Sequence, residues 1–220
     1  MADDFNSKYC ADFLRECYPG LKASHAHELV AAFFGYKSRA ALLADKSVDY
    51  LDQAHVLIPD ASVLDERRSS LNGLPDNLPR SQQLVDELVQ FVQNDELFTG
   101  DVWDCFDVGE YVMEEYLPAH VNPELDLELE AVTRSINAIF EDIEYDHCTV
   151  EERESGITVT VLGTYSGYSM DDDSDDDPVI DLEITVFLRR CAGRISFDEP
   201  EVYVTGTPRT AGDEASAVAS

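Results

Sequence analysis

The stretch that decides the fold is residues 180–188, with the sequence IDLEITVFL. Its apolar side chains alternate with Asp181, Glu183 and Thr185, which is the period of a β-strand with one buried face. The same alternation occurs at 143–148 and at 157–161. The second half of the chain is therefore predicted to be built on β-strands.

A fourth strand is predicted to start at about Arg194, to end at Phe197 and to resume at 201–205 beyond Pro200. The short turn at 191–193 makes the last two strands a hairpin. Together the strands predict a four-stranded antiparallel meander with one apolar face. A helix predicted at 123–140 would cover that face, because its apolar residues recur at spacings of four and three: Leu125, Leu129, Val132, Ile136 and Ile139.

The first 75 residues are predicted to form a helical module. Ser24 and Ser38 are the expected N-caps of two of its helices, and Gly35 ends the first of them. A turn-rich stretch at 72–79 predicts a boundary, followed by helices at 81–97 and from Asp107 to Leu117. The expected fold class is therefore α+β, and its parts are a helical module at 1–75, an acidic α+β domain at 81–206 and a disordered tail at 207–220.

Charge is the most unusual property of the chain. Its 220 residues include 46 Asp and Glu against 15 Lys and Arg, a formal net charge of -31. Residues 1–80 are nearly balanced, whereas 81–188 hold 29 acids and only Arg134 and Arg153 as bases. A regional field points to partner choice rather than to general solubility or salt adaptation. It also argues against direct binding of nucleic acid, which needs Lys and Arg.

Composition excludes several classes of protein. A hydrophobic content of 44% and an aromatic content of 10% are enough for a core, so the chain is not a disordered acidic tail. No apolar run approaches the roughly 20 residues of a membrane span, and the N-terminus lacks the features of an export signal. The five scattered cysteines contain no CxxC, which favours reduced thiols and a cytoplasmic location.

No catalytic motif is present, so we expect neither enzymatic activity nor a cofactor. The Asp-rich run 171–177 lacks the glycine and glutamate of an EF-hand loop, which favours a solvated hairpin loop over a calcium site. His25 and His27 are two residues apart, so a helix points them in different directions and prevents a shared metal ion. Only His25 and Glu28 share a face, and two ligands make a poor site.

One short segment, residues 22–46, carries a resemblance. It contains Ser24-His25-x-x-Glu28, then Gly35-Tyr36 and an Ala-Ala-Leu run ending at Leu42. These residues resemble a small helical motif of bacterial plasmid-associated proteins and of proteins labelled glyoxalase-related. The resemblance implies a bacterial or mobile-element setting, and it implies no glyoxalase chemistry. A helix-turn-helix centred on Gly35 would offer base edges only Arg39, so a plain helical hairpin is favoured.

These observations predict an acidic, non-enzymatic binding or inhibitor protein of a bacterial mobile element. It would act as a DNA mimic that occupies the basic groove of a nucleic-acid-binding protein or complex, of the anti-restriction or anti-CRISPR type. The N-terminal module would add a specific contact or form a homodimer. The expected partner-binding residues are Glu114, Glu115, Glu124, Glu128, Glu144, Asp146, Asp171, Asp172, Asp173, Asp175, Asp176, Asp177, Asp181 and Glu183.

Two alternatives remain open at this point. An antitoxin-like or regulatory protein would use the N-terminal hairpin to bind DNA or a partner, with Arg39 contributing to the contact. A metal-assisted hydrolase would use carboxylates and a divalent ion held by the 171–177 loop.

Overall fold

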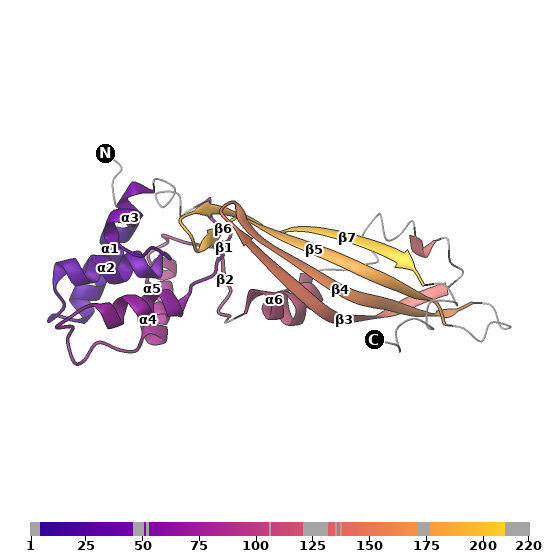
Figure 1. Cartoon of the computed structure of the whole chain (residues 1–220), viewed down its shortest axis with the longest axis horizontal. Coiled ribbons are helices and arrows are strands. Elements are labelled where there is room, and N and C mark those ends of the chain that lie inside the picture. Colours follow the sequence, from indigo (N-terminus) through magenta and orange to yellow (C-terminus); the bar gives the residue numbers. More distant parts are fainter. Residues whose placement is uncertain are drawn as a thin grey trace. The chain divides into compact units, whose positions relative to one another are not determined.

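The computed structural model describes residues 5–45, 51, 53–105, 107–120, 132–134, 136, 138–170 and 177–209 (Figure 1). Its elements follow the chain as α1 (Phe5–Cys17), α2 (Ala23–Phe33), α3 (Arg39–Ala44), β1 (Val56–Leu57), α4 (Ala61–Ser70), α5 (Ser81–Asn94), β2 (Asp101–Val102), α6 (Val108–Tyr111), the π-helical turn η2 (Val112–Tyr116), α7 (Leu117–His120), β3 (Ala138–Arg153), β4 (Gly156–Ser169), β5 (Val179–Ala192), β6 (Ser196–Phe197) and β7 (Glu201–Pro208).

Within the described residues the sheet is mixed and has seven strands, in the order β2-β1-β6-β5-β4-β3, with β7 also paired to β5. β1 pairs with β2 in parallel and with β6 in antiparallel orientation. The α+β class is correct, but the predicted four-stranded, wholly antiparallel meander is wrong. β1 and β2 have two residues each, and their partners lie far away in the sequence, as in the pair Val56↔Phe197. Local periodicity gives no signal for such pairing.

The helix predicted at 123–140 to cover the sheet is wrong at its C-terminal end, although Val132 and Thr133 are helical as predicted. Ala138–Phe140, its last residues, begin β3 instead. Ile139 is 41% exposed there, although the apolar stripe placed it in a core. The segment 121–131, which holds the first half of the predicted helix, lies outside the described residues.

The chain divides into two compact units. The first unit comprises residues 1–106, 154–156 and 188–200, and the second comprises 107–153, 157–187 and 201–220. The boundary expected from the sequence at 75–81 therefore lies inside the first unit. There Phe13 of α1 stacks on Phe91 of α5, with ring centroids 4.4 Å apart. Tyr18, the residue after α1, donates a 2.5 Å hydrogen bond from its hydroxyl to Glu87 of α5.

The core of the first unit is formed by helices, with α2 at its centre. This helix starts at Ala23, after an N-cap at Lys22 rather than at the expected Ser24. Its C-terminus is the one the sequence predicts: Gly35 has φ 79°, and the N–H groups of Gly35 and Tyr36 bond to the carbonyls of Ala32 and Ala31. These two hydrogen bonds form a Schellman motif, in which the residue at the position of Gly35 must adopt a left-handed backbone conformation.

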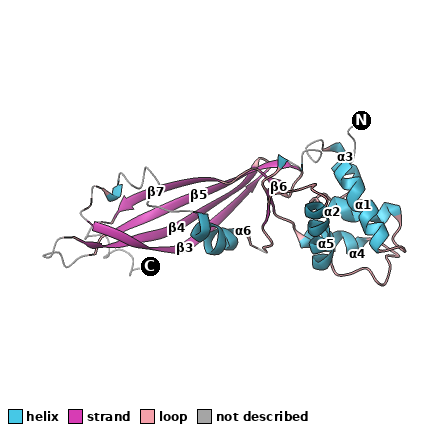
Figure 2. Cartoon of the chain, turned by 180° about the vertical axis from the view of Figure 1, so that it is seen from behind, coloured by secondary structure: helices cyan, strands magenta, loops and turns pink. Residues whose placement is uncertain are grey.

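The second unit combines the long strands β3, β4, most of β5, and β7 with the helical segment 108–120 (Figures 1 and 2). Asp107 is the N-cap of that segment, as the sequence predicts, and its Oδ1 accepts hydrogen bonds from the N–H groups of Gly109 and Glu110. Gly109 approaches the sheet so closely that an added Cβ would lie 2.8 Å from Cys148 Sγ and from Val150 Cγ2. The helical segment therefore covers one face of the sheet, and none of the described helices covers the opposite face.

Candidate functional site: the open face of the sheet

The two faces of the sheet in the second unit differ in burial. Along β5, Ile180, Ile184 and Val186 are at most 1% exposed, whereas the intervening Asp181 and Glu183 are exposed. β4 repeats the pattern, since Val159 is fully buried while Leu162 is 44% exposed. We call the side that carries Asp181, Glu183 and Leu162 the open face. The alternation of apolar and polar residues at 180–188 thus buries one side of β5 and exposes the carboxylates on the other.

Strand register places the open-face residues in rows across the sheet. Between β5 and β7, Asp181 pairs with Thr207, Glu183 with Thr205, and Thr185 with Tyr203. Between β4 and β5, the Gly167 N–H bonds to Pro178 O at one end, and the Arg190 N–H bonds to Ser155 O at the other. Both hydrogen bonds indicate the same register between β4 and β5. A row therefore runs Thr164, Asp181, Thr207, and the next row runs Leu162, Glu183, Thr205.

β3 adds a second column of carboxylates at the edge of this face. An added Cβ at Gly163 would lie 2.3 Å from Glu144 O, so β3 and β4 pack closely at that point. Consecutive residues of β3 are exposed at Glu141-Asp142, at Asp146-His147 and throughout 149–153. A β-bulge adds one residue to a strand, so successive residues on the same face are then three positions apart instead of two. We infer that such bulges place Glu144 and Asp146, which are both exposed, beside Thr164 and Leu162.

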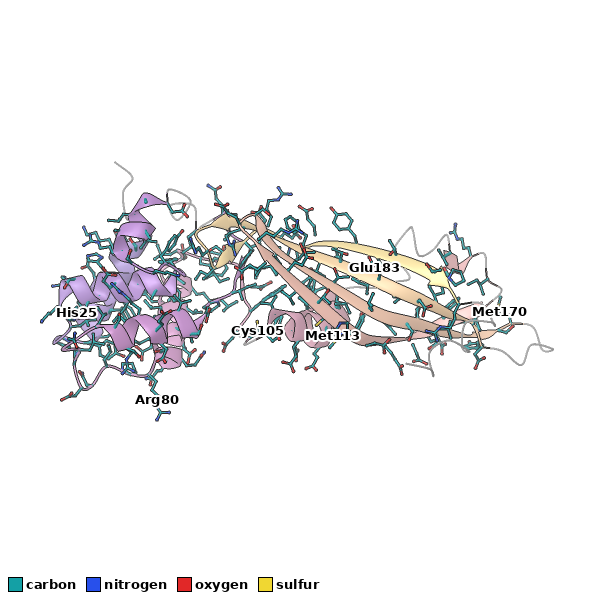
Figure 3. All side chains as sticks on the ribbon, in the orientation of Figure 1. His25, Arg80, Cys105, Met113, Met170 and Glu183 are labelled. Carbon is teal, nitrogen blue, oxygen red and sulfur yellow. The ribbon has the colours of Figure 1, made fainter. Side chains whose placement is uncertain are left out.

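The structure brings together four of the residues expected to bind a partner: Glu144, Asp146, Asp181 and Glu183. Figure 3 labels Glu183 partway along the sheet. Glu114 and Glu115 are exposed, but they belong to the helical segment on the other side of the sheet, near the labelled Met113. Asp177 is exposed at the start of the segment that leads into β5. The remaining predicted residues lie outside the described part of the chain: Glu124, Glu128, Asp171, Asp172, Asp173, Asp175 and Asp176.

The electrostatic character of the second unit is strongly negative. It contains 25 Asp and Glu and only three bases, Arg134, Arg153 and Arg209. Arg209 forms an ion pair with Asp181 on the open face, and Arg153 forms one with Glu151 at 2.7 Å. Burial, with the charges of Asp107 and Glu110, raises the pKa of the Cys148 thiol above its usual range. The negative charges of the second unit therefore contribute to the raised pKa of the Cys148 thiol within it.

Sequence reasoning missed the apolar and hydroxyl groups of the open face. Tyr203 is 59% exposed and Tyr168 is 45% exposed. On β4, Thr164 and Leu162 lie between the two carboxylate columns, and Thr158 and Thr160 continue the same face of the strand. The signal was present in the alternation, because the polar positions of 157–161 are Thr158 and Thr160 rather than acids. Arg209 was missed because the sequence placed it in the tail, whereas Thr207 and Pro208 just before it belong to β7.

The structure explains the role of Glu28 in the segment 22–46. The Glu28 carboxylate accepts a 2.5 Å hydrogen bond from Arg67 of α4 and another from the Arg39 N–H at the start of α3. Ser38 is the N-cap of α3 as predicted, accepting from the Ala41 N–H. Glu28 therefore links three helices. In the described part of the chain, no three His, Cys, Asp or Glu side chains are grouped closely enough to hold a metal ion.

Comparison with protein-family models, with curated proteins and with solved structures finds no match to this chain. Over the residues that the structure describes, no helix has the length and apolarity to cross a membrane. All five cysteines are described, and each is a thiol rather than part of a disulfide.

Proposed function

We propose that the chain is a non-enzymatic binding protein whose acidic second unit occupies the basic, nucleic-acid-binding surface of a partner protein. One observation carries the proposal. Glu144, Asp146, Asp181 and Glu183 lie on the same exposed sheet face, in a unit with 25 acids and three bases. A negative face of this kind complements a positive groove and speeds association with it, an effect that salt weakens.

The sheet gives these carboxylates a fixed spacing. Neighbouring strands lie roughly 4.8 Å apart, and side chains on the same face repeat at roughly 7 Å along a strand. Charges held in this way cost less entropy to bind than charges on a flexible tail. Inhibition of a restriction or CRISPR complex by imitation of its nucleic acid is the specific form of the proposal. A bacterial mobile element is the setting that the 22–46 resemblance suggests.

The test is a pull-down from a bacterial lysate on the immobilised full chain, at low and then moderate salt. We expect basic nucleic-acid-binding proteins to be retained at low salt and to be released by duplex DNA. The variant Glu144→Gln/Glu183→Gln should retain less of them. The control Glu16→Gln/Glu66→Gln removes the same charge from exposed helical positions of the first unit and should behave as the parent does. Retention that DNA does not reverse would contradict the proposal.

A further inference from the structure

The open face already binds one guanidinium, which belongs to the chain itself. Arg209 pairs with the Asp181 carboxylate, and its own N–H bonds to Val179 O at 2.9 Å. The Asp181 side chain is nevertheless 51% exposed in this pair. In this contact the cation on Asp181 is a guanidinium, and it comes from the residue that follows β7, the strand paired with β5.

The neighbouring rows repeat the same chemistry. By the register inferred above, Thr164 lies between Glu144 on β3 and Asp181 on β5, and Leu162 lies between Asp146 and Glu183. The two carboxylate columns are therefore two strand spacings apart, roughly 10 Å. A guanidinium above the β4 column has a carboxylate on each side, and its five donors form a fork that addresses both. The exposed Leu162 side chain provides an apolar surface for the arginine stem.

Aromatic rings extend this surface along the sheet. Tyr203 lies beside Thr185, one row beyond Glu183, and Tyr168 lies toward the opposite end of β4. Figure 3 labels Met170, which follows that end of β4 and is 56% exposed. Guanidinium groups stack on aromatic rings, whereas ammonium groups keep their hydration more strongly.

We propose that the open face binds an extended segment of a basic partner protein, with arginines at alternate positions seated over the β4 column. This deepens the proposed function and rests on it. Alternate side chains of an extended peptide repeat at roughly 7 Å, which is also the spacing of the Thr164 and Leu162 rows. Charge complementarity and the ion pair of Arg209 with Asp181 are the reasons for expecting arginine. The same-face spacing along the strands is the reason for expecting an extended peptide.

The experiment measures binding of fluorescein-labelled peptides to the full chain by anisotropy at low salt. One peptide has arginines alternating with threonines, a second has lysines in the same positions, and a third has the same arginines in one block. We expect the alternating arginine peptide to bind about fivefold more tightly than either of the others, because bidentate pairs are stronger. Equal affinity for the lysine peptide would overturn the choice of arginine.

Two matched pairs of variants locate the site. Glu183→Gln should weaken peptide binding about fivefold, whereas Glu66→Gln, an equal charge change on α4, should leave it unchanged. Arg209→Ala should tighten binding because it releases Asp181, whereas Arg80→Ala, at the N-cap of α5, should have no effect. All four side chains are exposed, and unchanged circular dichroism would show that each variant folds.

The outcomes separate this inference from the proposed function. If Glu66→Gln weakens binding as much as Glu183→Gln, overall charge is responsible and the open face is not the site. If basic proteins are retained from lysate in a DNA-reversible way while Glu183→Gln leaves peptide affinity unchanged, the function stands and this inference fails. If the peptide binds as expected but DNA releases nothing from the pull-down, the proposed function fails and the arginine site stands.

Discussion

Gly35 and Gly73 both adopt left-handed backbone, with φ 79° and 75°, but their surroundings differ. A Cβ at Gly35 would lie 2.9 Å from Arg194 Cβ, whereas one at Gly73 would meet nothing within 4 Å. Alanine at either position costs about 1 kcal/mol for the backbone conformation. We expect Gly35→Ala to lose about 1–2 kcal/mol more than Gly73→Ala in the free energy of unfolding, measured with denaturant. Equal losses would show that Arg194 yields without cost.

Cys10 is fully buried in the first unit, and burial raises the pKa of its thiol from 9.0 to about 12. A raised pKa means that the unfolded chain loses this proton at lower pH than the folded chain does. The contribution to stability is therefore complete below about pH 9 and is lost as the pH rises toward 12. We expect Cys10→Ala to flatten the fall in unfolding free energy over this range. Burial and the charges of Glu87 and Glu16 also raise the pKa of the exposed Cys17 thiol, so Cys17→Ala should flatten the fall too, but less than Cys10→Ala does.

At the scale of elements, the β3–β4 pair depends on Gly163. A Cβ there would lie 2.3 Å from the Glu144 carbonyl oxygen, which is backbone and cannot rotate away. We expect Gly163→Ala to separate the strands and to cost about 2–4 kcal/mol of unfolding free energy. Thr164→Ala, one residue along on the open face, should cost less than about 1 kcal/mol. Hydrogen exchange of the β3 amides would show whether the loss is local.

Local signals predicted some elements and missed others for a physical reason. Ser38 and Asp107 were found as N-caps because a cap bonds to N–H groups two or three residues away. Strands 143–148 and 180–188 were found by alternation, although both were predicted too short. The pairing of Val56 with Phe197 was missed because nothing near either residue encodes it.

The same reasoning explains what was predicted of the candidate site. Alternation placed Glu144, Asp146, Asp181 and Glu183 on the uncovered side of the sheet, where the structure also has them exposed. The bulges of β3 were not predicted, because an extra residue in a strand depends on its partner. The ion pair of Arg209 with Asp181 joins residues 28 apart and depends on the β5–β7 register.

At the scale of the whole molecule, the charge makes stability depend on salt. The net charge is -31, and 25 of the 46 acids lie in the second unit. Raising ionic strength from about 0.01 to 0.15 M shortens the Debye length from about 30 to 8 Å and weakens this repulsion. We expect the melting temperature to rise by about 3 °C or more, followed by circular dichroism. A fall would indicate that attractive ion pairs dominate.

The first unit is assembled from separate stretches of the chain, and this bears on how the protein is made. β1 completes its pairing only with β6, and the hydrogen bonds from the N–H groups of His55 and Ile58 go to Phe197 O and Ile195 O. When the first 106 residues have emerged from the ribosome, residues 195–197 have not yet been synthesised. β1 therefore stays incompletely paired until residues 195–197 have emerged, near the end of synthesis. Expression fragments that stop at residue 75 or 106 would carry this unfinished edge permanently, so the intact chain is the proper material for every binding experiment.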